Sequence, residues 1–443
     1  KNIKGYEHMK KIIGIRREDK NEWERRVPII PEDLAELSEK YGIEAVVQPS
    51  ANRIYTDEVY KKDGAILNEN FENVNTVFAV KEIPTQLLET EKTYIFFSHT
   101  IKGQDYNMDM LRQLMALKCN LIDYERIVNE KGQRLIFFGA HAGYAGMFET
   151  LVAYAKKLQL NGMDSPLAKI KQAYEYASLE EAKQHIKEIG KEISDKGLPE
   201  AICPLIVGFT GYGQVSGGAQ EILDILPVKE ITPDQIENIR KESTADRHHI
   251  YKVVFKEQDM VKPLSGEFEL QDYYNSPEQY QSVMENYLPS IDILVNCIYW
   301  TPKYPRIISK SWLKEQAAAG KSLKLKVIGD ISCDIEGAIE ITYDATMPDK
   351  PCFTYFPESD SFKDEITADG FTVMAIDNLP CEFSKEASMS FSKVLKTFVA
   401  DIVDADFSKP FDELDLPYPI KKALILHQGQ LTKEYKYMEE FIK

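Results

Sequence analysis

The segment LIVGFTGYGQVSGGAQEILDIL, residues 205–226, constrains the fold more than any other part of the chain. Its apolar start predicts a buried strand, which runs into glycines and then into an amphipathic helix. Gly211 and Gly213 fit the first two positions of the G-x-G-x-x-G pattern, and the small Ser216 stands at the third. Such a strand–turn–helix unit is typical of the turn that holds the pyrophosphate of a dinucleotide. We therefore expect a Rossmann-like domain here; a plain glycine turn is the alternative.

The same pattern places the residue that holds the adenosine ribose about 20 positions further on. The predicted strand PVKEIT ends there, and Glu230 and Thr232 are both candidates. A carboxylate at this place favours NAD, and its absence favours NADP. The sequence therefore leaves the choice of cofactor open.

Predicted strands and helices alternate before this segment, which indicates an α/β fold with a parallel sheet and helical crossovers. We expect a helix in PEDLAELSEKYG, with Pro31 in its first turn and Gly42 at its end. The charged segment SLEEAKQHIKEIGKEISDKG has its apolar residues on one helix face, so it should form an outer layer. Ser384 is expected to be the N-cap of a later helix.

Composition and charge exclude several classes of protein. A chain of 443 residues suggests two or three domains, and its net charge of −17 argues against nucleic-acid binding. No stretch approaches the roughly 18 apolar residues of a membrane helix, and no secretory signal is visible. The six cysteines are scattered without ligand spacing, so we expect neither disulfides nor a metal site. These features indicate a cytoplasmic protein, or one of the mitochondrial matrix if the source is eukaryotic.

Two predicted strands end in charged or titratable side chains. VFAVKEIP, residues 77–84, runs into Lys81 and Glu82, and FFSHTIK, residues 96–102, contains His99. The carboxyl ends of parallel strands meet at one edge of a sheet, so Lys81 and His99 can lie together. Taken alone, both positions are more typical of solvated strand ends than of a site.

Several further blocks occur in a fixed order along the chain. They are IRREDKNEWERRVPIIP, VKEIP, FFSHTIKGQ, LIDYERI, GQRLIFFGAHAGYAGM, GFTGYGQVSGGAQ, DRHH, LVNCIYW, GDISCDIEGAIE and MAIDNLP. Together they resemble the lysine–ketoglutarate reductase (saccharopine-forming) domain of the bifunctional aminoadipic semialdehyde synthases. Fungal saccharopine dehydrogenase and alanine dehydrogenase are more distant relatives in the same superfamily.

The resemblance implies two Rossmann-like domains with parallel sheets that flank a cleft. The first, a substrate domain, is discontinuous and should comprise residues 1–140 and 350–443. The dinucleotide-binding domain, residues 141–349, is inserted between its two parts and carries additional helical and acidic segments. This order explains why the glycine turn comes so late in the chain.

The resemblance also implies the reaction: NAD(P)-dependent condensation of L-lysine with 2-oxoglutarate to saccharopine, or the reverse oxidation, through an imine. Lys81 and His99 match the family's acid–base groups. Residues that match its substrate-binding positions are Arg17, Arg26, Glu82, Lys102, Glu125 and Arg134. Cofactor contacts are expected at Gly208, Gly211, Tyr212, Gly213, Gln214, Val215, Glu230, Thr232, Asn296, Ile298, Asp330, Ser332 and Asp377, with NADP favoured over NAD.

Two other functions remain open at this point. An alanine-type amino-acid dehydrogenase would use the same chemistry, and a non-catalytic nucleotide-binding module would need neither Lys81 nor His99. In every case we expect small-molecule partners, no membrane contact and a possible homo-oligomer. The adjacent His248 and His249 belong to the DRHH block, but they have no assigned role.

Overall fold

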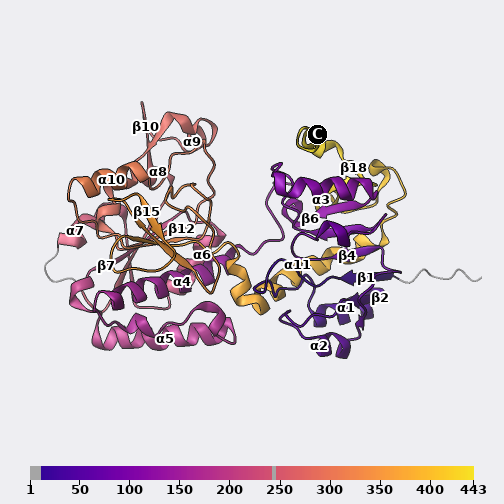
Figure 1. Ribbon diagram of the computed structural model, residues 1–443, viewed down its shortest axis with the longest axis horizontal. Helices are drawn as coiled ribbons and strands as arrows, with labels where there is room; N and C mark the ends of the chain where they lie inside the picture. Colours follow the sequence, from indigo (N-terminus) through magenta and orange to yellow (C-terminus); the bar gives the residue numbers. More distant parts are fainter. Residues whose placement is uncertain (1–10, 242–245) are drawn as a thin grey trace, which may run out of the picture. The chain divides into compact units, whose positions relative to one another are not determined.

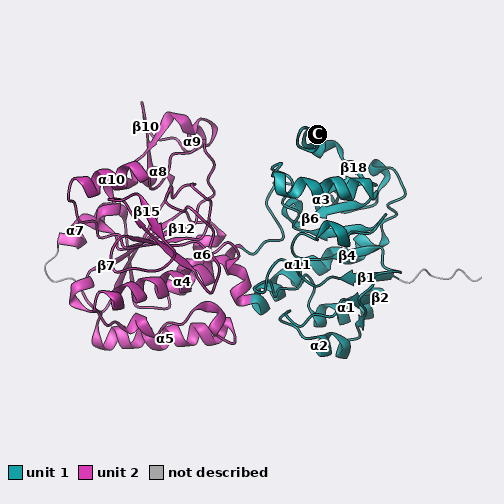
Figure 2. Ribbon diagram, in the orientation of Figure 1, with its two compact units in different colours: residues 1–138, 384–443 teal, residues 139–383 magenta. Residues whose placement is uncertain are grey.

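The computed structural model describes residues 11–241 and 246–443. These form two compact units, shown in Figures 1 and 2. Unit 1 comprises residues 1–138 and 384–443, and unit 2 comprises residues 139–383. The first unit therefore consists of two segments that are far apart in the sequence.

The described part of unit 1 forms an eight-stranded sheet in the order β18-β17-β6-β5-β4-β1-β2-β3. Its first six strands in the chain are parallel, and β17 pairs antiparallel with β6 and with β18. The strand bounds are β1 Lys11–Ile15, β2 Ile43–Val47, β3 Ile66–Leu67, β4 Thr76–Phe78, β5 Thr93–Phe96, β6 Asn120–Asp123, β17 Leu424–His427 and β18 Gln430–Leu431. The helices are α1 Pro31–Tyr41, α2 Asp57–Lys62, α3 Asp105–Ala116, α11 Ser384–Asp404, α12 Tyr418–Ala423 and α13 Glu439–Ile442.

Unit 2 is built, over its described residues, on a second eight-stranded sheet in the order β15-β14-β16-β13-β12-β7-β9-β8. Its strands are β7 Leu205–Thr210, β8 Val228–Ile231, β9 Ile250–Phe255, β12 Ile293–Asn296, β13 Val327–Asp330, β14 Cys352–Phe356, β15 Ser361–Lys363 and β16 Phe371–Met374. The helices are α4 Gly139–Leu160, α5 Leu179–Lys196, α6 Gln214–Leu223, α7 Ile236–Lys241, α8 Glu257–Met260, α9 Leu270–Asn275 and α10 Lys310–Ala318. Strands β10 Val261–Pro263 and β11 Tyr280–Ser282 form a separate antiparallel pair. Both units are thus α/β, and both sheets are mostly parallel, as predicted.

The boundary between the units differs from the expected residue 350. Strand β16 pairs parallel with β13, and β14 pairs antiparallel with β16, so this part of the chain extends the second sheet. Unit 2 therefore continues to Phe383.

The alternation of side chains along β7 explains why unit 2 has helices on both faces of its sheet. Leu205, Val207 and Phe209 belong to the core that includes α4, α5 and α6, whereas Ile206 belongs to the core that includes α10. All residues of β7 are buried. A parallel strand that is covered on both faces reads as a continuous apolar run, which is why this segment was recognisable in the sequence.

Several local predictions are confirmed, and two need correction. Helix α1 begins at Pro31 and ends at Tyr41, and Gly42 caps it with the left-handed φ of +66° that favours glycine. Helix α5 buries the predicted apolar face. Ser384, however, follows directly on a 3-10 helix, Leu379–Phe383, so it is the first residue of α11 and not an N-cap. Strand β4 ends at Phe78, which leaves Lys81 three residues beyond it, in a loop.

Helices α4 and α6 approach closely because each has a glycine at the contact. A Cβ on Gly143 would lie 2.1 Å from the Val215 carbonyl oxygen, and one on Gly218 would lie 2.3 Å from the Ala140 carbonyl oxygen. The sequence pattern assigned close packing to the third position, Ser216. The structure buries Ser216 but places the close backbone approach at Gly218.

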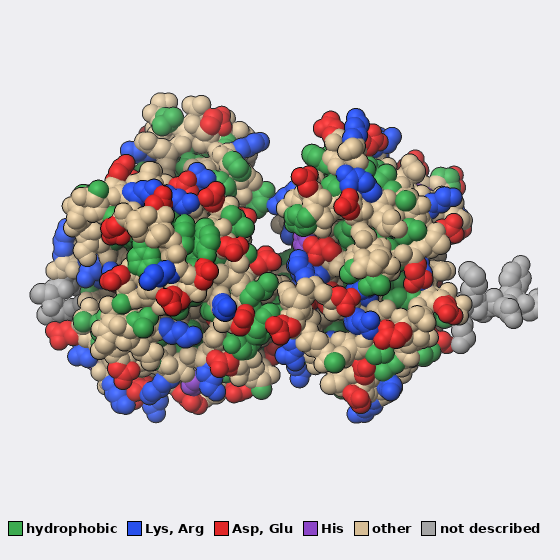
Figure 3. Space-filling view, viewed as in Figure 1, with side chains coloured by type: hydrophobic (Ala, Val, Ile, Leu, Met, Phe, Trp, Pro, Cys, Tyr) green, Lys and Arg blue, Asp and Glu red, His purple; other side chains and the backbone are tan. Residues whose placement is uncertain are grey.

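Acidic and basic side chains are interspersed on both units over the face shown in Figure 3. Among the described helices, none is both long and apolar enough to cross a membrane.

Candidate dinucleotide and acid–base sites

The turn after β7 has the backbone that a dinucleotide requires. Gly211 adopts a left-handed φ of +79°, and a Cβ there would lie 2.9 Å from Cγ2 of Ile298. A Cβ on Gly213, by contrast, would meet nothing within 4 Å, which leaves open space at the start of α6. Gln214 and Val215 form the first turn of that helix. A tight turn, an open approach and a helix N-terminus are the features that accept a pyrophosphate.

The carboxyl ends of β7, β12 and β13 are joined by buried hydrogen bonds. Thr210 donates to Asn296 Oδ1 at 2.7 Å, Asn296 donates to Asp330 Oδ1 at 2.9 Å, and Thr342 donates to Asp330 Oδ2 at 2.6 Å. Burial raises the pKa of Asp330 to about 6. Asn296 and Asp330 therefore hold three strand ends in register beside the glycine turn.

Other predicted cofactor residues lie around the same strand ends. Ser332 donates to the carbonyl oxygen of Ile298 at 2.6 Å, which joins the loops after β13 and β12. Asp377 follows β16 and donates its backbone N–H to Thr346. Gly208 lies inside β7, where a Cβ would come within 2.9 Å of the Phe255 ring.

The predicted ribose residues lie at the end of the expected strand, but this strand is not the one that pairs with β7. Strand β8, which contains Glu230, pairs only with β9 at the edge of the sheet, and β9 occupies the place beside β7. Glu230 forms an ion pair with Lys252 at 3.1 Å, and Thr232 lies in the turn before a 3-10 helix. The spacing from the glycine turn fits both residues, but the sheet places them one strand too far out.

In unit 1, the loop after β4 that carries Lys81 is held by the half-buried carboxylate of Glu18. The backbone N–H groups of Val80 and Lys81 donate to the two Glu18 oxygens at 2.6 and 2.9 Å. Burial, and then the charge of Glu24, raise the pKa of Glu18 to about 7. Burial also lowers the pKa of Lys81, and the positive charge of Arg26 lowers it further.

His99 lies beside this loop and is oriented by Glu82. Its Nδ1 is 2.5 Å from Glu82 Oε1, and Lys20 Nζ is 3.4 Å from Glu82 Oε2. Burial alone would raise the pKa of Glu82, but the hydrogen bond and charge of His99, with Lys20, lower it to about 2. The backbone of His99 has a positive φ of +49°, which is uncommon for a residue with a side chain. The loop after β5 thus presents the imidazole with its Nε2 side away from the carboxylate.

A second carboxylate, that of the fully buried Asp123, supports the His99 loop. Both the backbone N–H and the hydroxyl of Ser98 donate to Asp123, as does the backbone N–H of Glu125. Glu125 also forms an ion pair with Arg134. Two of the predicted substrate residues are therefore paired with each other.

The predicted cationic residues differ in their exposure. Arg26 is only 2% exposed; it forms a paired contact with Glu24 and lies over the Phe138 ring at 4.2 Å. Arg17 is partly exposed and pairs with Glu69. Lys102 lies in the exposed part of the loop after His99.

Sequence reasoning missed Glu18 and Asp123, although both contact the loops that carry Lys81 and His99. In the sequence, Glu18 is one of many charged residues in its segment, and Asp123 is the last residue of a predicted strand. Neither position indicates a functional role. A carboxylate at a strand end is a weak signal, because its partners are backbone groups that are remote in the sequence.

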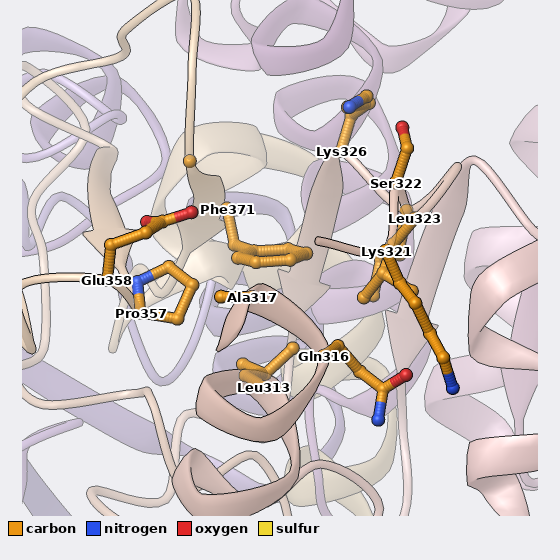
Figure 4. Close-up of a pocket in the computed structure, with 12 residues that line it drawn as sticks. Leu313, Gln316, Ala317, Lys321, Ser322, Leu323, Lys326, Pro357, Glu358 and Phe371 are labelled. Atoms are coloured by element: carbon orange, nitrogen blue, oxygen red, sulfur yellow. The ribbon is translucent and has the colours of Figure 1, made fainter. Parts of the chain in front are cut away.

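Two other features of unit 2 lie outside the candidate site. His248 contacts the Ser194 carbonyl oxygen at 2.8 Å, and His249 contacts Asp246 at 2.7 Å, so both make contacts within their own unit. A pocket of about 150 Å³ lies between α10 and the start of β16, where Leu313 and Phe371 line it (Figure 4). It is at the amino ends of the parallel strands, whereas the glycine turn follows a carboxyl end.

The comparisons with known proteins agree with this arrangement. The family model of the alanine dehydrogenase/PNT N-terminal domain matches residues 14–145. Over its full length the chain is 36% identical to an alpha-aminoadipic semialdehyde synthase of Arabidopsis thaliana, of which it spans 43%. It is 26% identical to a saccharopine dehydrogenase (NAD(+), L-lysine-forming) of Neurospora crassa, over 86% of this chain and 88% of that protein.

Among solved structures, an L-alanine dehydrogenase matches with a TM-score of 0.62 at 15% identity, over 98% of this chain and 100% of the other. This likeness shows a shared fold. Together with the sequence relatives, it confirms the resemblance of the ordered blocks. Over its whole length the chain is similar to the alpha-aminoadipic semialdehyde synthases, and it spans less than half of their length.

Proposed function

We propose that the chain catalyses the nicotinamide-dependent condensation of L-lysine with 2-oxoglutarate to saccharopine, or the reverse oxidation. The observation that carries the proposal is the state of Lys81. Its side chain is half-buried, its pKa is lowered, and its ammonium group makes no hydrogen bond or ion pair among the described residues. A lysine used only for stability would be paired or solvated, whereas an acid–base lysine needs a lowered pKa.

The reaction requires protons to move at several points. The substrate amine must lose a proton, attack the keto carbon and release water to form an imine. Lys81 Nζ is suited to accept and return these protons because its pKa is closer to neutrality than that of a free lysine. His99 is the second proposed acid–base group. With its Nδ1 held by Glu82, Nε2 is the atom left to exchange a proton.

A nicotinamide dinucleotide supplies the hydride that reduces the imine. The glycine turn fits this group, because Gly213 leaves open space where a side chain would block the pyrophosphate. We assign the pyrophosphate to the turn of Gly211–Val215. The family resemblance favours NADP, but the choice between NADP and NAD depends on the charge beside the adenosine ribose.

The remaining predicted residues have supporting roles in this proposal. Arg17, Lys102 and Arg134 are the partly exposed cations that would bind the substrate carboxylates. Arg26 is paired within the protein, so we assign it an electrostatic role: it keeps the pKa of Lys81 low. Glu82 orients His99, and Glu125 holds Arg134.

The test is an assay of NADH and NADPH oxidation with 2-oxoglutarate, with and without L-lysine. Oxidation that requires lysine supports the proposal. Oxidation with pyruvate and ammonia alone would indicate an alanine-type dehydrogenase instead. Dinucleotide binding without turnover of any amine and oxo acid would indicate a binding module.

The variant Lys81→Met tests the role of the lysine. We expect kcat/KM to fall about a hundredfold or more, because an acid–base group contributes on the order of 10²–10⁴. Binding of the dinucleotide, measured by its fluorescence, should change less than about threefold, since Lys81 lies in unit 1. Activity within about threefold of the wild type would contradict the assignment.

A further inference from the structure

The C-terminal segment, residues 433–442, packs on the loop that carries Lys102. It consists of a 3-10 helix, Lys433–Met438, and of α13, which lies against α3 (Figure 1). Arg112 on α3 donates from its Nε to the carbonyl oxygen of Ile442 at 3.0 Å, which fixes the end of the segment. All of these residues belong to unit 1.

The C-terminal segment contacts the loop immediately before and immediately after Lys102. The hydroxyl of Tyr437 donates to the carbonyl oxygen of Ile101 at 2.7 Å. On the other side of the lysine, Gly103 lies so close to the ring of Phe441 that a Cβ on this glycine would come within 2.4 Å of it. Gly103 also has a left-handed φ of +67°, and its N–H closes a turn onto the carbonyl oxygen three residues earlier. The backbone of Lys102 is thus held between two contacts from one segment.

His99, in the same loop, is held by other elements. Asn107 on α3 donates to the His99 carbonyl oxygen at 3.2 Å, and the backbone N–H of Ser98 donates to Asp123 at the end of β6. The imidazole and the ammonium group of this loop therefore have separate supports.

We propose that Tyr437 and Phe441 are positioning residues, which hold the turn around Lys102 so that its ammonium group meets a substrate carboxylate. The inference rests on the proposed function, in which Lys102 binds such a carboxylate. A lysine is a point charge on a flexible stem, so the place of its charge depends on where the backbone directs it. Tyr437 and Phe441 are 48% and 39% exposed, and neither belongs to the core described for unit 1.

A double-mutant cycle tests whether Tyr437 acts through Lys102. The proteins are the wild type, Tyr437→Phe, Lys102→Met and the double variant, assayed with dinucleotide, L-lysine and 2-oxoglutarate. For the substrate whose KM rises most in Lys102→Met, Tyr437→Phe should raise KM about threefold to tenfold, the effect of one hydrogen bond. It should leave kcat within about twofold, because His99 keeps its supports. When Lys102→Met is already present, the same change should alter KM less than about 1.5-fold.

The variant Tyr418→Phe is the matched control. Tyr418 is also 48% exposed, and its hydroxyl makes no hydrogen bond among the described residues, so its loss should leave KM unchanged. Thermal unfolding will show whether each variant is folded. Three results would overturn the proposal: an unchanged KM for both substrates in Lys102→Met, an effect of Tyr437→Phe that is as large without Lys102, or an equal loss in kcat.

Hydrogen exchange gives an answer that does not depend on turnover. In Tyr437→Phe and in Phe441→Ala, the amides of residues 100–103 should exchange about threefold to tenfold faster, whereas those of β6 should not change. If the wild type does not turn over lysine and 2-oxoglutarate but the loop exchanges faster in both variants, the proposed reaction fails and the support of the Lys102 turn stands. Unchanged exchange in both variants overturns the positioning role.

Discussion

Unit 2 contains a buried pair of carboxyl groups that should make its stability depend on pH. Glu149 on α4 and Glu382 in the 3-10 helix before α11 are both buried, and neither side-chain oxygen of Glu382 has a hydrogen-bond partner among the described residues. Glu149 accepts hydrogen bonds from the Ala173 N–H at 2.8 Å and from the Gln172 side chain at 2.9 Å. These donors stabilise the charged form of Glu149, whereas Glu382 has none, so Glu382 is the carboxyl group that binds a proton.

The sign of the effect follows from the direction of the pKa shift. Burial, and then the charge of Glu149, raise the pKa of Glu382 well above its ordinary value of 4.5. Between that value and the raised one, the folded state binds a proton that the unfolded state has lost. The free energy of unfolding therefore falls as the pH rises, by up to about 1.4 kcal/mol for each pH unit and each proton. Below pH 4.5 this loss is absent.

The variant Glu382→Gln removes this titration and keeps a side chain that can donate to Glu149. We expect the variant to lose less stability than the wild type between pH 5 and pH 8, by about 1–3 kcal/mol. Urea unfolding at each pH unit measures the free energy of unfolding of both proteins. The contributions of the other titrating groups cancel in the difference, because both proteins contain them. Glu278→Gln, at an exposed position, is the matched control. Equal pH slopes for Glu382→Gln and the wild type would refute the raised pKa of Glu382.

Two further changes test the packing and the charges of the individual units. Gly218→Ala should destabilise unit 2 by about 1–3 kcal/mol in urea unfolding, because the new Cβ would meet the α4 backbone. Gly217→Ala is the matched control: its Cβ would point into open space, so it should stabilise α6 by about 0.5–1 kcal/mol. Glu24→Gln should cost about 3–5 kcal/mol of unit 1 stability, since it leaves Arg26 buried without its counter-charge; a loss below about 1 kcal/mol would show that Arg26 finds another partner or water.

Features that depend on neighbouring residues could be predicted from the sequence. The strand, turn and helix of residues 205–223 are fixed by local preference and by burial on both faces, and the structure has them as expected. The same holds for α1 with its Gly42 end and for the apolar face of α5. In each case the residues that determine the structure are close neighbours in the sequence.

Features that depend on pairing between distant strands could not be predicted. Glu230 has the right spacing from the glycine turn, and nothing near it indicates that β9 enters the sheet between β8 and β7. Likewise, the role of Glu18 arises from N–H groups 62 and 63 residues further along the chain. The sequence identifies which residue types are present, but sheet order decides which of them share an edge.

The neighbours Lys81 and Glu82 show how such pairing determines chemistry. Adjacent in the sequence, they suggest an ion pair that would raise the pKa of the lysine and keep it protonated. In the structure Glu82 is bonded to His99 and Lys20, and Glu24 is bonded to Arg26. Each of these carboxylates already has a cationic or imidazole partner, so burial and the charge of Arg26 outweigh their attraction and lower the pKa of Lys81. Burial, with the charges of Arg26 and Lys20, is therefore what makes Lys81 better able to release a proton than a solvated lysine.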